Sequence, residues 1–476
     1  MSTLSKLGGA VIQDATSAPM TAELADYIAQ VANAPRTAAD TEAVRTLLLD
    51  NCIVSLWGAS RPWTRELAQW TKRFAGTGAS PVLAGAWTAE PSVAALVHGT
   101  AAHSFELDDT HDETLSHPGS AIIPATLALA ADMDAPQADL VRALTAGYEA
   151  MALLGASAGG METVHRGFHP TSVFGSFGAA TACICLHAYR SGEAVTADML
   201  VSAWGHALSQ ACGAMQFSDE AGGGEVKRVH AGFGARNGVL AAEFARMPSV
   251  TSPRRSVEGT YGLAALFGGP LRHVEPAEKL QIHNISFKPY SCCRLFHSTI
   301  DALREVTQDF STPTDSIASI TVSGPQLIAD QHMLQDPKGS MAAQYACPYI
   351  VGATLAYGPQ RYDAYGNEFL EDPAIRSVAR KVRFELSEEL ARKYYPNHFA
   401  TGVRLRLTDG SERYAMVVDS RGTPRKPLTK EQVLAKGDGL AGGTGAQIGA
   451  RLQACIWDDA QGARALASSL AQAAHP

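Results

Sequence analysis

The chain has 476 residues, of which 46% are hydrophobic and 18% are charged, and its formal net charge at pH 7 is −8. This composition is typical of a globular protein with a large core, and it excludes an intrinsically disordered chain. The acidic balance argues against a surface that binds nucleic acid or anionic membranes, because either surface needs a concentrated basic face.

Compartment and cysteine usage agree with an ordinary intracellular protein. Residues 1–19 lack the apolar core of a secretory signal, and we find no continuous apolar stretch of the roughly 18 residues that span a bilayer. The eight cysteines are scattered and have no CxxC spacing, which argues against zinc and dithiol redox sites. We therefore expect a cytoplasmic protein with reduced thiols, not bound to a membrane.

From about residue 20 to residue 270, the sequence is dense in Ala, Leu and Gly. Segments such as DTEAVRTLLLDNCIVSLWGA (40–59) and MLVSAWGHALSQACGAM (199–215) place apolar residues three and four positions apart. This spacing predicts helices that pack in a bundle, and the small residues allow close approach.

Beyond residue 310 the pattern changes to alternation. SIASITVSG (316–324) alternates, and VRLRLTDGSERYAMVV (403–418) is two alternating runs around Asp409-Gly410, which predicts a hairpin. The last segments return to helical composition. We therefore predict a mainly α protein in which a helical domain (20–272 plus 428–472) is interrupted by a smaller α+β domain (273–427).

The stretch FELDDTHDETLSHPG (105–119) carries five acids and two histidines between two segments that we predict to be helices. We expect the first helix to end near Asp108 or Asp109 and Ser120 to cap the next one, which places the acids on a loop. One interpretation is a solvated turn. The other is a site loop, because these acids would be costly to bury without partners.

Two further clusters supply basic groups. In RGFHPTS (166–172), a helix that begins near Thr171 would favour a carboxylate beside His169, although a histidine next to a proline is more often structural. In GGGEVKRVHAGFGARNG (222–238), Lys227 and Arg228 are candidates for binding substrate carboxylates. A phosphate-binding loop is the competing interpretation, but the GxxxxGK[ST] order is absent.

The fourth cluster is KPYSCCRLFH (288–297). Adjacent Cys292 and Cys293 suggest a catalytic nucleophile, but buried structural cysteines are the favoured interpretation. Tyr290 and Arg294 are the better candidates for polar groups of a site. Together the clusters offer histidines for proton transfer and cations for carboxylates, with no evident metal or cofactor site. This combination suits proton transfer next to a carboxylate, followed by elimination, decarboxylation or inversion.

The phrases FELDDTH…SHPG, GFHPTSVFGSFGAA, KRVHAGFGARNG and KPYSCCRLFHSTIDA resemble the MmgE/PrpD family, in order from about residue 20 to residue 460. This family includes 2-methylcitrate dehydratase, cis-aconitate decarboxylase and iminodisuccinate epimerase. The resemblance implies a large helical domain with an inserted α+β lid domain, a homodimer, and chemistry without a metal or an organic cofactor.

The resemblance also implies site residues. The acid, threonine and histidine of the first motif fall on Glu106, Thr110 and His117, and the other motifs supply His169, Lys227 and Tyr290. Two features depart from the family: Glu106 replaces the aspartate of the animal decarboxylase, and one extra residue lies between the threonine and the histidine. LSHPGSA (115–121) also replaces the WGHPSDN-like phrase of the dehydratases, so dehydratase activity is less favoured.

We therefore predict a cofactor-independent lyase acting on a small di- or tricarboxylate, with cis-aconitate-like decarboxylation ahead of dehydration. An epimerase-like isomerase and a non-catalytic carboxylate-binding protein are the alternatives. The predicted catalytic residues are His117, His169, Lys227 and Tyr290. The predicted substrate-binding residues are Glu106, Thr110, Arg228 and Arg294.

Overall fold

The computed structural model describes residues 19–219, 223–395, 398–441 and 445–474. Helices dominate it, which confirms the predicted mainly α class. The first half of the chain contributes eleven of the described helices: α1 (Met20–Asn33), α2 (Ala38–Ala59), α3 (Pro62–Thr71), α4 (Pro91–Ala102), α5 (Pro118–Met133), α6 (Gln137–Ala158), α7 (Gly160–His165), α8 (Pro170–Ser191), α9 (Ala197–Leu208), α10 (Val226–Ala245) and α11 (Leu263–Phe267). A two-stranded ladder of β1 (Ser80–Pro81) and β2 (Thr88–Ala89) lies between α3 and α4.

Helix α8 lies at the centre of this bundle, in contact with α5, α6, α9 and α10. Contrary to our expectation of no such stretch, α8 is long and apolar enough to cross a bilayer by length and composition, but its apolar window is entirely buried inside the protein. It is the core helix of the bundle. The neighbouring α4–α10 crossing depends on small residues: a Cβ on Gly99 would lie 2.8 Å from the Cα of Gly232. This close approach brings the start of α10 beside the end of α4.

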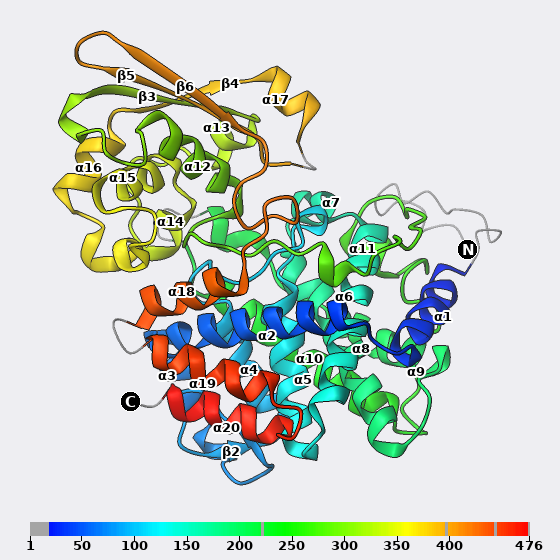
Figure 1. Ribbon diagram of the computed structural model, residues 1–476. Helices are drawn as coiled ribbons and strands as arrows, with labels where there is room; N and C mark the ends of the chain where they lie inside the picture. The colour runs from blue at the N-terminus through cyan, green and yellow to red at the C-terminus, as the bar shows by residue number, and fades with distance from the viewer. Residues whose placement is uncertain (1–18, 220–222, 396–397, 442–444, 475–476) are drawn as a thin grey trace.

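A second lobe, at the upper left of Figure 1, contains a four-stranded sheet in the order β4-β3-β5-β6. Its strands are β3 (Ile317–Gly324), β4 (Val382–Leu386), β5 (Thr401–Leu407) and β6 (Glu412–Val417). The predicted hairpin is confirmed, since β5 and β6 are antiparallel and Gly410 takes the left-handed φ of 87° that their turn requires. The lobe's helices are α12 (His297–Val306), α13 (Leu327–Gln331), α14 (Ser340–Tyr345), α15 (Cys347–Tyr357), α16 (Pro373–Ala379) and α17 (Glu388–Lys393).

The last three helices return to the first lobe. Helices α18 (Lys430–Ala441), α19 (Gly445–Trp457) and α20 (Ala463–Ala473) lie against α2, and α20 also contacts α5 (Figure 1). A buried lysine ties this segment to the rest of the molecule, because Lys436 Nζ donates to Asp50 Oδ1 at 2.9 Å and to the Leu107 carbonyl at 2.7 Å. The C-terminal segment therefore supports the loop that follows α4.

Candidate active site

The loop between α4 and α5 is buried, so the interpretation as a solvated turn is wrong. Helix α4 ends at Ala102, earlier than we expected, and α5 begins at Pro118 with His117 at its N-cap in place of Ser120. The side chains of Glu106, Asp108 and Asp109 are nearly inaccessible to solvent. Glu106 also has a positive φ of 55°. Such a conformation is costly for a residue with a side chain and is typical of sites that the surrounding structure holds in place.

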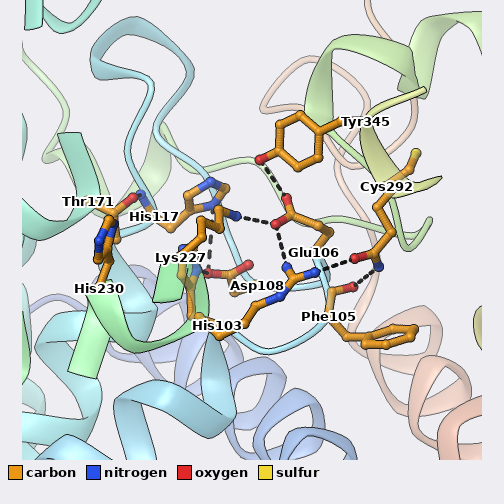
Figure 2. A network of polar contacts seen from close by, with 12 residues as sticks. His103, Phe105, Glu106, Asp108, His117, Thr171, Lys227, His230, Cys292 and Tyr345 are labelled. Atoms are coloured by element: carbon orange, nitrogen blue, oxygen red, sulfur yellow. Dashed lines mark hydrogen bonds and ion pairs between the residues drawn. The ribbon is translucent and has the colours of Figure 1, made fainter. Parts of the chain in front are cut away.

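The Glu106 carboxylate lies in a cage of three cations, of which Lys227 is labelled in Figure 2. Its Oε1 pairs with Lys227 Nζ and accepts from Arg228 Nη1 at 2.8 Å, while its Oε2 accepts from Lys288 Nζ at 3.2 Å and from the Tyr345 hydroxyl at 3.3 Å. Burial alone would raise the pKa of Glu106, but the three cations, Lys227 foremost, hold it well below its usual range. Glu106 is therefore a carboxylate, and the cations around it outnumber it.

The candidate carboxylate-binding residue Lys227 lies in the interior of the protein and not in solvent. Both Lys227 and Arg228 are completely buried at the first turn of α10, and burial lowers the pKa of Lys227. Arg228 also donates through Nη2 to Gln344 Oε1 at 2.7 Å, which connects α10 to the second lobe. Charges buried to this extent need partners, so these two side chains support the fold as well as the site.

Two histidines share one acid beside this cage. His103, at the C-cap of α4, places Nδ1 at 2.6 Å from Asp108 Oδ2, and His117 Nδ1 lies 3.7 Å from the same oxygen. Figure 2 shows both rings close to Lys227. Burial lowers the pKa of His103, and it lowers the pKa of His117 to about 3. These lowered pKa values favour the neutral form of both rings near pH 7.

Backbone contacts hold His117 in place. Its Nδ1 lies 2.8 Å from the Asp109 carbonyl and 3.3 Å from Thr110 Oγ1, and its amide donates to Thr171 Oγ1 at 3.1 Å. The Asp109 carboxylate accepts from the Tyr148 hydroxyl at 2.7 Å, and burial raises its pKa to about 7. The predicted residues Thr110 and His117 are therefore in direct contact.

His169 joins the same cluster from the start of α8. It occupies the N-cap of this helix, and its ring centre lies 5.4 Å from that of His103 and 5.3 Å from that of His230 on α10. His169 Nδ1 and His230 Nδ1 are 3.2 Å apart. Burial and the nearby Lys227 hold the pKa of His169 well below its usual range. The structure thus brings together His117, His169, Lys227, Glu106, Thr110 and Arg228, as the sequence motifs predict.

Two predicted residues lie elsewhere. The Tyr290 hydroxyl donates to Asp301 Oδ1 on α12, and Arg294 donates to Ser420 Oγ at 2.7 Å and to Asp112 Oδ2 at 3.2 Å. Neither side chain has a hydrogen bond to the Glu106 cage. The reason is local: the chain after Lys288 turns toward α12, so Tyr290 packs against His297, with ring centres 5.2 Å apart. The tyrosine that reaches Glu106 is Tyr345.

Five residues of the site were not selected from the sequence: His103, Asp108, His230, Lys288 and Tyr345. Lys288 opens the fourth motif and Asp108 lies inside the first, so attention to every charged residue of the motifs would have found them. Tyr345 comes from AAQYACPY, which has no local sign of chemistry. Cys292 and Cys293 are not nucleophile candidates, because burial raises the pKa of both thiols, that of Cys293 to about 11.

His103, Asp108 and His117 also present ligand atoms within 4.8 Å of one another, which is a geometry to test for a metal ion. Two ligand atoms of a tetrahedral zinc site are about 3.3 Å apart. The 2.6 Å between His103 Nδ1 and Asp108 Oδ2 is a hydrogen-bond distance, and His117 Nδ1 is already engaged by the Asp109 carbonyl. The arrangement fits a hydrogen-bonded network better than a preformed metal site.

Comparison with known proteins matches residues 22–273 to the MmgE/PrpD N-terminal domain and residues 290–457 to the MmgE/PrpD C-terminal domain. The chain belongs to the MmgE/PrpD family. It is 28% identical to a cis-aconitate decarboxylase of Aspergillus terreus over 454 residues, which cover 89% of each chain. It is 27% identical to the cis-aconitate decarboxylase-like protein oryM of Aspergillus oryzae, over 89% of this chain and 90% of that protein. It is 24% identical to the cis-aconitate decarboxylase of Mus musculus, over 82% of this chain and 80% of that protein.

Proposed function

We propose that this member of the MmgE/PrpD family is a lyase that decarboxylates a small di- or tricarboxylate resembling cis-aconitate. The family relatives described above carry the name cis-aconitate decarboxylase at 24–28% identity, which supports the class of reaction and leaves the substrate to be tested. The observation that carries the proposal is the buried cage of Lys227, Arg228 and Lys288 beside a cluster of neutral histidines.

The charges of the cage favour an anionic ligand. Three cations converge on Glu106, and further negative charge lies nearby on Asp108 and on Glu225, which pairs with Arg228 Nε at 3.3 Å. Carboxylate groups of a substrate would accept hydrogen bonds from the same lysines and arginine. A substrate with two or three carboxylates therefore suits this site.

Two helix N-termini point to the same ligand class. His117 and His169 are the N-caps of α5 and α8, so the N-terminal ends of both helix dipoles lie next to the histidine cluster, although the Gly119 N–H already donates to Asp109 Oδ1 at 2.8 Å. The partial positive charge of such termini stabilises carboxylates. The neutral imidazoles supply lone pairs for proton transfer.

A 2-methylcitrate dehydratase-like activity and an iminodisuccinate epimerase-like activity are the alternatives within the family, because both also move a proton beside a carboxylate. A non-catalytic carboxylate-binding protein is the alternative outside it. The buried His103–Asp108 pair and the contact between His169 and His230 favour catalysis, because binding alone needs only the cations.

We further propose that the second lobe acts as a lid over the site, with residues 273–427 as the inserted domain. Three of its side chains support this role: Lys288 and Tyr345 contact Glu106, and Gln344 contacts Arg228. Operation without a metal or an organic cofactor, a homodimeric assembly and a cytoplasmic location are parts of the same proposal. Turnover after exhaustive chelation tests the first of these, and light scattering tests the second.

The deciding experiment incubates the purified protein separately with cis-aconitate, 2-methylcitrate and iminodisuccinate and follows the products by NMR. Release of CO2 with formation of a decarboxylated product from cis-aconitate is the expected result. Loss of water from 2-methylcitrate, or inversion of iminodisuccinate, would replace decarboxylation by one of the family alternatives. Binding of these compounds without any turnover would support the carboxylate-binding protein.

A further inference from the structure

The His103–Asp108 pair has no role in the predicted catalytic set, although it lies at the centre of the cluster. The exposed fractions of the two side chains are 0% and 1%. Asp108 Oδ2 lies 2.6 Å from His103 Nδ1, and a carboxylate only accepts hydrogen bonds, so the imidazole nitrogen facing it is the donor. The proton of neutral His103 is therefore on Nδ1. The lone pair on Nε2 is buried and has no hydrogen-bond partner among the described residues.

The position on the helices distinguishes His103 from the other two histidines. His103 is the C-cap of α4, where the partial negative charge of the terminal carbonyls stabilises a cation. His117 and His169 are the N-caps of α5 and α8, where the opposite partial charge disfavours a cation. His103 also has a carboxylate at 2.6 Å. Of these three rings, His103 has the surroundings that best suit a positive charge.

Opposing groups set the protonation state of His103, and a bound anion would change their balance. Burial and the charge of Lys227 lower the pKa of His103, while Asp108 and Glu106 oppose them. The rings of His117 and His169 also face it, at centre distances of 5.0 and 5.4 Å. A polycarboxylate bound at the cations would add negative charge beside Lys227, which favours the charged form of a neighbouring imidazole.

We propose that His103, oriented by Asp108, takes up a proton when the substrate binds and supplies it in the reaction, while His117 and His169 stay neutral and orient the substrate carboxylates. This assignment rests on the proposed function. In the decarboxylation step, the bond from carbon to the leaving carboxylate breaks and CO2 departs. The electron pair of that bond stays on the carbon skeleton and takes the proton from His103 Nε2 as a C–H bond forms. His103 returns to its neutral form, and Asp108 remains a carboxylate throughout.

Proton uptake on binding gives a direct test. Isothermal titration with tricarballylate, a saturated tricarboxylate, is carried out near neutral pH in phosphate and in Tris, and the difference in heat reports the protons taken up. We expect about one proton per site for the wild type and almost none for His103→Gln. His98→Gln is the matched control, because His98 is a buried histidine of the same helix without a carboxylate partner. Full proton uptake by His103→Gln would overturn the proposal.

Kinetics separate a proton donor from a purely structural residue. His103→Gln should lower kcat by about 10²-fold or more and raise KM by a smaller factor, because proton donation follows binding whereas proton uptake accompanies it. Asp108→Asn should shift the pH profile of kcat to lower pH, because it removes the charge that favours the imidazolium. A structural defect would lower activity equally at every pH. If His103→Gln fails to fold, as judged by circular dichroism, Asp108→Asn still tests the assignment through reduced proton uptake.

Failure of the proposed function is distinguishable from failure of this assignment. A wild-type protein that neither binds tricarballylate nor converts any of the three candidate substrates would refute the proposed function. Histidine NMR on the ligand-free protein, with the His103 signal identified by His103→Gln, still decides the assignment. The structure requires the proton on Nδ1 of His103, and a proton on Nε2 would contradict it.

Discussion

Lys227, at the first turn of α10, pairs with Glu106, which lies 121 positions earlier in the chain on the loop after α4. The contact depends on the close crossing of α4 and α10. From the sequence, Lys227 and Glu106 are two separate candidates for binding a substrate. In the structure they form one buried ion cluster together with Arg228 and Lys288.

The first prediction concerns this cluster. Glu106→Gln should lower the free energy of unfolding by about 3–5 kcal/mol, because it leaves three buried cations without their carboxylate. Lys227→Met should cost less, about 1–3 kcal/mol, because Arg228 and Lys288 still neutralise Glu106. Urea unfolding measures both, with Lys338→Met as the control because its side chain is exposed. A larger loss for Lys227→Met than for Glu106→Gln would contradict this account of the cage.

The second prediction concerns Asp109, whose pKa is raised to about 7 in the folded protein from 3.8. Folding therefore favours the protonated acid, so its contribution to stability is complete below about pH 4 and is lost as the pH rises to about 7. Asp109→Asn cannot ionise; its Oδ1 can still accept from the Gly119 amide, and its Nδ2 can donate to the Tyr148 hydroxyl oxygen, with the direction of that bond reversed. As the pH rises from about 4 to about 7, the free energy of unfolding of the variant should therefore increase relative to that of the wild type by up to about 1.4 kcal/mol per pH unit.

Urea unfolding of both proteins at several pH values measures this difference. The buried histidines titrate in both proteins, so the comparison isolates Asp109. A constant difference between the two proteins from pH 4 to 7 would show that Asp109 is already ionised in the folded state at the acidic end.

The third prediction concerns the two N-cap histidines. His117→Ala and His169→Ala should each lower kcat by about 10²-fold or more on the true substrate, because each holds a carboxylate or a proton in the reacting geometry. Steady-state kinetics measure this effect, and His187→Ala is the control, since His187 lies on α8 and pairs with Glu243 outside the cluster. Near-normal turnover by His117→Ala would leave the loop without the role we assign to it.

The fourth prediction separates the two tyrosines. Tyr345→Phe should lower kcat/KM by roughly tenfold, because it removes a hydrogen bond to Glu106 in the cage. Tyr290→Phe should lower stability by about 1–3 kcal/mol, because Asp301 loses a buried donor, while kcat changes little. Kinetics and thermal unfolding on the same samples test both statements. A large loss of kcat/KM for Tyr290→Phe, with little change for Tyr345→Phe, would favour Tyr290, the tyrosine that the family resemblance suggested.

Local features of the sequence were sufficient for the mainly α class, the β5–β6 hairpin and most of the site motifs. The hairpin follows from Asp409-Gly410 between alternating runs, which is a short-range signal. Strand β4 was not predicted, because its place beside β3 comes from a parallel pairing across about 60 residues of intervening chain, which no local pattern encodes. The acids of residues 105–119 suggested a site, but their burial depends on partners from α10 and the second lobe.

The sequence by itself determined which chemical groups are present: histidines, cations and acids in motifs that belong to one family. Only the tertiary structure decided how these groups are paired. It turned Tyr290 toward Asp301, brought Tyr345 to Glu106 and joined His103 to Asp108. The physical reason is that a buried charge or ring nitrogen takes its protonation state from the partners packed around it. Those partners come from distant helices whose crossing is set by the packing of the whole core.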